Sequence, residues 1–95
     1  MARLSITKKH RLSHDAARAA AERVAQELRT RFELTYAWEG DRIRFKRPGL
    51  SGELAVSEKE VRLDAELGFL LSAFRGAIER EVHSEFDKRF GSMKA

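Results

Sequence analysis

The sequence predicts an α+β domain of two layers, in which two amphipathic helices pack on one face of an antiparallel sheet. In several short stretches apolar and polar residues alternate, which is typical of strands with one buried face. In two longer stretches apolar residues recur at every third or fourth position, which is typical of amphipathic helices. The order is strand, helix, four-stranded meander, helix. At 95 residues the chain has the size of one domain, 1–95, with a structured core over about 3–90 and a frayed tail over 91–95.

A short strand and a helix open the chain. Leu4 and Ile6 alternate with polar neighbours and predict the strand. Ser13 is a suitable N-cap, and Asp15 would lie in the first turn, where a negative charge suits the helix dipole. The helix is predicted over 14–32, and its apolar stripe consists of Ala17, Ala20, Ala21, Val24, Leu28 and Phe32.

Four alternating segments then predict a meander. Gly40-Asp41 supplies the first tight turn, Arg47-Pro48-Gly49 ends the second arm, and 57–60 forms the last turn. The residues expected to face inward are Leu34, Tyr36 and Trp38, then Ile43 and Phe45, then Leu50, Gly52, Leu54 and Val56, then Val61, Leu63, Ala65 and Leu67. The order of strands at the sheet edges stays open.

The last helix is predicted from about Leu70 to Phe90. Its core stripe consists of Leu71, Phe74, Ile78, Val82, Phe86 and Phe90. Phe69 and Leu70 have no automatic place on this stripe. Together with Leu71 they form the candidate apolar contact edge, which would cap the core, contact a partner or join two copies in a homodimer.

The charge pattern indicates a second candidate surface. The net charge is +4, and residues 1–32 hold eight Lys or Arg against three Asp or Glu. The candidate basic face consists of Arg42, Arg44, Lys46 and Arg62, which would project from the open face of the sheet toward an anionic partner such as nucleic acid or phospholipid. The same face is expected to carry Glu33, Glu39, Asp64 and Glu66. Cross-strand pairing explains this mixture without a ligand, and the inward aromatics leave no stacking platform.

No residue pattern indicates catalysis, a cofactor or a metal. The chain has no cysteine, and His10, His14 and His83 lack the spacing and companion ligands of a zinc site. Ser13-His14-Asp15 is no triad, because adjacent residues on one turn point in different directions. No phosphate-binding glycine motif is present. We therefore expect no catalytic, cofactor-binding or metal-binding residues and no enzymatic activity. Without a secretory signal or a transmembrane segment, the expected location is the cytoplasm.

Several motifs resemble those of one known family. They are the Trp38-Glu39-Gly40-Asp41 turn, the strand containing Gly52, LGFLL at 67–71 leading into IERE at 78–81, and FDKRF at 86–90. The combination resembles the polyhydroxyalkanoic acid system protein family over roughly Leu4 to Phe90. The resemblance implies a small bacterial protein associated with polyhydroxyalkanoate production and granules, with no established catalytic residues. The family pattern often has proline where this chain has Ala77, which implies that regular helix begins near there and that LGFLLSAFRG is partly a separate turn.

Three functions remain open at this point. The leading hypothesis is a non-enzymatic cytoplasmic accessory protein of polyhydroxyalkanoate metabolism that binds the granule surface or a granule protein. The first alternative is a small module that binds an apolar acyl or lipid ligand between sheet and helix. The second alternative is a basic nucleic-acid-binding domain.

Overall fold

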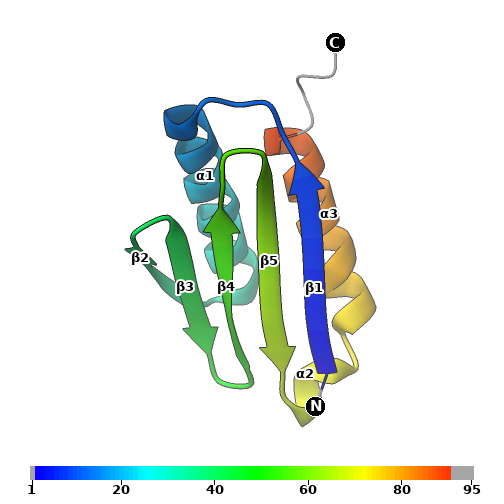
Figure 1. The fold of residues 1–95 in the computed structure, drawn as a ribbon. Helices are drawn as coiled ribbons and strands as arrows, with labels where there is room; N and C mark the ends of the chain where they lie inside the picture. Colours follow the sequence, from blue (N-terminus) through cyan, green and yellow to red (C-terminus); the bar gives the residue numbers. More distant parts are fainter. Residues whose placement is uncertain (1, 91–95) are drawn as a thin grey trace.

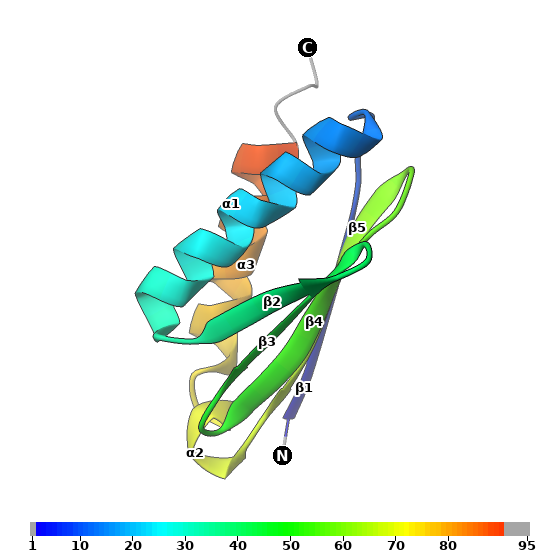
Figure 2. The ribbon, with the colours of Figure 1, turned by 90° about the vertical axis from the view of Figure 1, so that its left-hand side faces the viewer.

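In the computed structural model, which describes residues 2–90, helices cover one face of a five-stranded antiparallel sheet and leave the other face open (Figures 1 and 2). The predicted two-layer α+β fold is therefore confirmed. The elements are β1 (Ala2–Lys9), α1 (His14–Phe32), β2 (Thr35–Glu39), β3 (Arg42–Arg47), β4 (Leu50–Val56), β5 (Glu60–Leu67), α2 (Phe69–Ser72) and α3 (Arg75–Phe90). The tail predicted over 91–95 lies outside the described residues. No helix within 2–90 is long and apolar enough to cross a membrane.

The sheet has the strand order β1-β5-β4-β3-β2. Strands β2 to β5 form the predicted meander, and Gly40, at φ +61°, supplies the left-handed residue of its first turn. Strand β1 pairs along its whole length with β5, from Ala2 opposite Leu67 to Lys9 opposite Glu60. The first strand and the last strand of the chain thus lie side by side, and β1 and β2 are the two edges.

Helix α1 begins and ends as its local sequence dictates. The Oγ of Ser13 accepts a hydrogen bond from the Ala16 N–H at 3.2 Å, which confirms the predicted N-cap. At the other end Glu33 has φ 56° and donates its N–H to Arg29 O at 2.8 Å. Glu33 was expected on the open sheet face. That expectation is wrong, because this residue ends the helix before β2 begins.

The core lies between the sheet and the two long helices. Ala17 and Ala21 are fully buried, and these small side chains bring α1 close to the sheet. The predicted stripe of α3 is buried from Ile78 onward. The largest fully buried apolar side chains are Leu4, Val24, Ile43, Leu54, Val61, Leu63, Leu67, Val82, Phe86 and Phe90.

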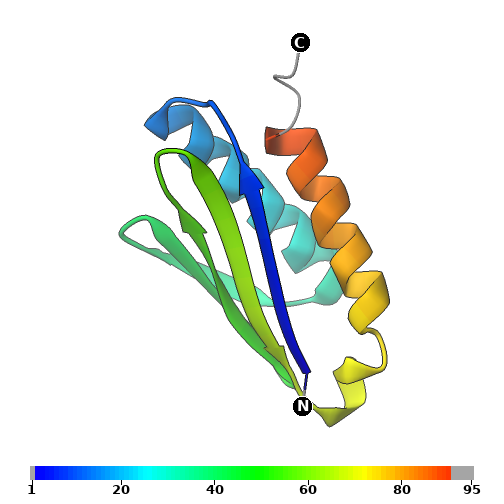
Figure 3. The same cartoon turned by 45° about the vertical axis from the view of Figure 1, so that its right-hand side comes forward.

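The predicted continuous helix from Leu70 to Phe90 is wrong, because a turn at 73–74 separates α2 from α3. The N–H of Phe74 donates to Leu71 O at 2.9 Å and ends α2. The turn redirects the chain, so that α3 runs back along β1 over the covered face of the sheet (Figure 3). Phe74 was expected in the core. It lies in the turn and is exposed, because the core contact of α3 starts only at Ile78.

Candidate functional site

Three large apolar side chains project into solvent at the joint between β5 and α3. Phe69 is 83% exposed, Leu70 78% and Phe74 59%, and no other large hydrophobic residue within 2–90 belongs to the exposed class. We call these three residues the apolar tip. They lie at one end of the molecule, where α2 crosses the end of the sheet near the N-terminus (Figure 3). The positions of Phe69 and Leu70 agree with the apolar edge expected from the sequence; whether this edge contacts a partner stays a prediction.

Leu71, the third residue of the predicted edge, turns the other way. It is partly buried against the core, and its Cδ1 lies 3.4 Å from where a Cβ on Gly49 would stand. The Gly68 N–H donates to Gly49 O at 2.7 Å, and Ser72 Oγ donates to Phe69 O at 2.8 Å. The contacts of Gly68 and Leu71 with Gly49 hold α2 against the β3–β4 turn, and the bond from Ser72 to Phe69 lies within α2 itself. The tip is therefore a structured projection, and Phe74 takes the place in it that the sequence suggested for Leu71.

The predicted basic face lies on the open side of the sheet, as expected, but its arginines are ion paired. Arg42 lies 3.6 Å from a carboxylate oxygen of Glu53, Arg44 lies 3.2 Å from Glu39, and Arg62 lies 3.0 Å from Asp64. Lys46 forms no ion pair within the described residues and lies opposite Ser51. The first two pairs join neighbouring strands, which is the cross-strand neutralisation that the mixed charges suggested, whereas Arg62 and Asp64 pair within β5.

A broad concavity lies over this open face, and not between the sheet and the helices. Its lining combines cations, carboxylates and small residues: Arg3, Ser5, Thr35, Tyr36, Ala37, Arg44, Phe45, Lys46, Ser51, Gly52, Glu53, Arg62, Asp64, Ala65 and Glu66. An apolar ligand held between sheet and helix would need space that the buried core residues fill. The fold thus gives no support to the acyl-ligand hypothesis.

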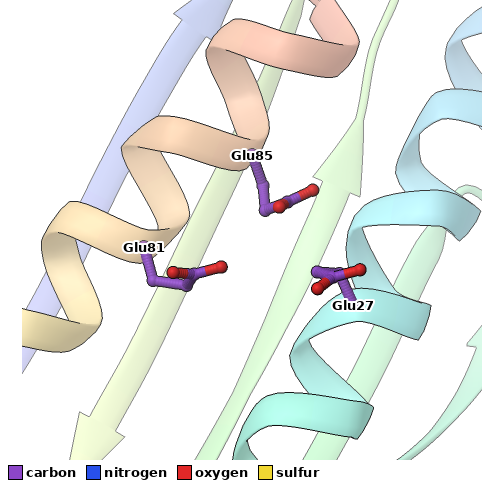
Figure 4. A group of neighbouring side chains, drawn as sticks. All are labelled: Glu27, Glu81 and Glu85. Carbon is purple, nitrogen blue, oxygen red and sulfur yellow. The ribbon is translucent and has the colours of Figure 1, made fainter.

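Three carboxylates meet between the two long helices. Glu27 of α1 and Glu81 and Glu85 of α3 point toward one another (Figure 4), and one oxygen from each lies within 4.8 Å of the others. Glu85 is only 1% exposed. Carboxylate oxygens are suitable ligands for Mg²⁺ or Ca²⁺, so these are the described residues that could hold such an ion.

Side-chain cations already neutralise these carboxylates. The Nε of Arg31 lies 3.1 Å from Glu27 and 2.9 Å from Glu81 and so links α1 to α3. The two oxygens of Glu85 lie 3.2 Å from the Nε of Arg89 and 3.7 Å from the Nζ of Lys88. The cluster is a closed ion network that joins two helices, and its charge balance requires no metal.

A second network ties the β2–β3 hairpin to α1 and is centred on Glu22. Its two carboxylate oxygens accept hydrogen bonds from Tyr36 Oη at 2.7 Å and Trp38 Nε1 at 2.6 Å. These bonds, that from Tyr36 foremost, hold the pKa of Glu22 below its ordinary value, whereas burial and the bond to Glu22 raise the pKa of Tyr36. The guanidinium of Arg18 stacks over the Trp38 ring at 4.1 Å, and that of Arg29 lies 5.6 Å from the Tyr36 ring.

The turn of the same hairpin is held by Asp41. Its Oδ1 lies 3.0 Å from Nε2 of His14 and accepts a hydrogen bond from Arg18 at 2.8 Å, and Arg18 also donates to Gly40 O at 2.7 Å. The bonds from His14 and Arg18 lower the pKa of Asp41. Much of the Trp38-Glu39-Gly40-Asp41 motif is therefore explained by attachment of the hairpin to α1.

His10 is buried where β1 leaves the sheet. Its Nδ1 accepts a hydrogen bond from the Leu12 N–H at 3.1 Å, so the proton of the neutral ring must lie on Nε2, which donates to Ser57 O at 3.0 Å. Its ring also lies 5.5 Å from that of Phe90. The role of His10 is to join three segments of the chain, through Leu12, Ser57 and Phe90.

The sequence reasoning missed the carboxylate cluster and the Glu22 network. A signal for the first was present, because Glu85 lies three residues after Val82 and directly before Phe86 on the apolar stripe. A carboxylate on a core-facing stripe indicates a buried ion pair. For Glu22 no such signal exists, since its partners come from a strand whose position against α1 depends on the whole fold.

The comparison with family models matches residues 4–90 to the family described as "Putative polyhydroxyalkanoic acid system protein". Neither the curated proteins nor the solved structures contain a match. The match spans β1 to the end of α3 and thus includes the apolar tip and both polar networks. Because the family model covers nearly the whole chain, this protein belongs to the polyhydroxyalkanoic acid system protein family.

Proposed function

We propose that this protein is a non-enzymatic accessory protein of polyhydroxyalkanoate metabolism that attaches to the granule surface through the apolar tip. The family supplies the context of the polymer. The observation that carries the proposal is the exposure of Phe69, Leu70 and Phe74 within six consecutive residues. Exposed apolar side chains gathered at one site on a small domain are typical of a contact with an apolar surface.

The construction of the tip supports the proposal. Leu71 packs against the core while its neighbours project outward, so the exposed side chains are held in place before any contact. A contact made by a held segment loses less conformational entropy than one made by a disordered segment. The polar clusters elsewhere are explained by their internal ion pairs and hydrogen bonds, which supports a role in binding rather than in catalysis.

The test is co-sedimentation with purified polyhydroxyalkanoate granules. The wild-type protein is expected in the granule pellet. The Phe69→Glu and Leu70→Glu variants are each expected to stay in the supernatant, because a carboxylate resists transfer into an apolar phase. Ala19→Glu places the same charge on an exposed position of α1 and is the matched control. Equal pelleting of all four proteins would overturn the proposal.

Imaging supplies the cellular counterpart. A fluorescently tagged protein is expected to be punctate in cells that make the polymer and diffuse in cells that do not. A diffuse signal in both strains, with the tagged protein intact, would contradict attachment to the granule.

A further inference from the structure

We propose that the apolar tip binds a surface of anionic phospholipid, with Phe69, Leu70 and Phe74 inserted among the acyl chains and nearby cations on the phosphate groups. This inference rests on the proposed function, since it assigns the chemistry of the surface that the same tip contacts. It follows from the charges around the tip, which a purely apolar contact would not use.

Two arginines of α3 lie directly beside the tip. Arg75 follows Phe74 in the chain and is exposed. The side chain of Arg80 folds back toward the start of α3, with its Nη1 3.9 Å from where a Cβ on Gly76 would stand. Neither arginine forms an ion pair within the described residues. Their charges are therefore free to contact an anionic partner.

The adjoining end of the sheet adds further cations. Arg47 precedes the turn that touches Leu71, and its guanidinium donates to the carbonyls of Phe32 and Pro48, which leaves its charge without a carboxylate. Arg3 and Lys46 lie in the strand ends near α2 and also have no ion pair among the described residues.

The surroundings of the tip are therefore positive. In these strand ends and in 75–80, the positively charged residues are Arg3, Lys46, Arg47, Arg75 and Arg80, and the negatively charged residues are Glu66 and Glu79. Five positive charges minus two negative charges give a net charge of +3.

Unpaired cations alone do not define the surface, because others occur elsewhere. Arg23 on α1 and Lys59 in the β4–β5 turn also lack ion pairs within residues 2–90, but no large apolar residue near them is in the exposed class. Only beside α2 do exposed apolar side chains and unneutralised cations coincide in the described part of the chain. This combination is typical of domains that insert into the boundary between headgroups and acyl chains.

The electrostatic part of the binding can be measured separately from the apolar part. Each cation near an anionic lipid surface strengthens binding roughly fivefold, and salt weakens this contribution. A neutral apolar surface gains nothing from the same cations. Dependence on lipid charge therefore distinguishes a phospholipid surface from bare polyester.

The experiment is sedimentation of the full chain with vesicles of phosphatidylcholine alone or of an equimolar mixture with phosphatidylglycerol. Wild-type protein is expected to pellet with the mixed vesicles and to be released by salt. Arg75→Gln/Arg80→Gln is expected to bind roughly 25-fold more weakly, from two cations at about fivefold each. Arg23→Gln/Lys59→Gln makes the same change in net charge away from the tip and is expected to cause a much smaller loss.

Each outcome bears on one proposal. Equal binding to both kinds of vesicle, equal losses in the two double variants, or no binding to vesicles would each overturn the phospholipid assignment. Sedimentation with lipid-free polyester particles distinguishes failure of the phospholipid assignment from failure of the proposed function. A protein that binds these particles but not the vesicles rejects only the phospholipid surface. A protein that binds native granules, but neither the particles nor the vesicles, indicates a granule protein as the partner. Circular dichroism melts of all variants confirm that they are folded.

Discussion

The indole Nε1 of Trp38 donates a 2.6 Å hydrogen bond to the carboxylate of Glu22, and this bond joins the β2–β3 hairpin to the exposed side of α1. Tyr36 donates to the other oxygen of the same carboxylate. One glutamate thus connects two aromatic residues of edge strand β2 to the helix. The edge strand depends on this connection, because β2 has only one neighbouring strand.

Replacement of Glu22 by alanine is expected to destabilise the fold. It removes three hydrogen bonds to a charged acceptor, from Tyr36, Trp38 and Gln26, but Gln26 is exposed and the two aromatic donors are only partly buried, so all three can turn to water and the expected loss is about 1–2 kcal/mol. Urea unfolding measures the change. Arg23→Ala, at the next and exposed position of α1, makes no contact with the Glu22 carboxylate among the described hydrogen bonds and ion pairs; it is the control and is expected to cost much less. An unchanged midpoint for Glu22→Ala would show that the network does not hold the hairpin.

The same carboxylate predicts how stability depends on pH. The pKa of Glu22 is held below its ordinary value of 4.5, and that of Asp41 below 3.8, by hydrogen bonds to the ionised forms. A lowered folded-state pKa contributes stability above the unfolded value, and this contribution is lost as pH falls through the folded value. The melting temperature of the wild type should therefore fall more steeply below pH 4.5 than that of Glu22→Gln. Parallel curves would contradict the predicted coupling.

Gly52 is expected to tolerate no side chain. A Cβ there would stand 2.3 Å from Asp64 O and 2.8 Å from Ala65 Cα, and both are backbone atoms that cannot give way cheaply. Gly52→Ala should therefore cost about 1–3 kcal/mol or more. Gly76→Ala is the contrasting control, because only Nη1 of Arg80, at 3.9 Å, lies nearby and alanine favours the helix by about 1 kcal/mol. Equal thermal stability of the two variants would contradict the predicted close approach of β4 to β5.

His10→Phe keeps the ring but removes both of its hydrogen bonds. The Leu12 N–H and the Ser57 carbonyl then lose their partner, and we expect a loss of about 2 kcal/mol. His83→Phe changes an exposed position of α3 and is the control. Chemical denaturation of both variants tests this. Equal effects would show that aromatic packing, rather than hydrogen bonding, is what His10 supplies.

The carboxylate cluster predicts an asymmetry between two substitutions. Arg89→Met leaves Glu85 buried with a weaker counter-charge and is expected to cost about 3 kcal/mol, whereas Glu85→Leu leaves behind cations that reach solvent and is expected to be nearly neutral. Thermal unfolding with and without Mg²⁺ measures both effects. A rise in the wild-type melting temperature on addition of Mg²⁺, absent in Glu85→Leu, would contradict the closed ion network and indicate a metal site.

Local patterns identified most of the fold because their physical causes are local. Ser13 can cap only the helix that follows it, and Gly40 can supply the left-handed turn residue without reference to distant segments. The prediction of one continuous last helix failed for the opposite reason. The turn at Phe74 is placed by the contact of Leu71 with Gly49 and by the return of α3 along β1, and both depend on segments distant in sequence.

By itself the sequence determined the α+β class, the meander, the inward faces of the strands, and Phe69 and Leu70 as residues without a place in the core. These follow from periodicity, since the spacing of apolar residues decides which side chains a helix or strand can bury together. Only the tertiary structure decided that β1 pairs with β5, that Phe74 rather than Leu71 is exposed, and that Glu85 is buried against Glu27 and Glu81. These depend on where separate elements meet, because burial and ion pairing arise from contacts that no single segment contains.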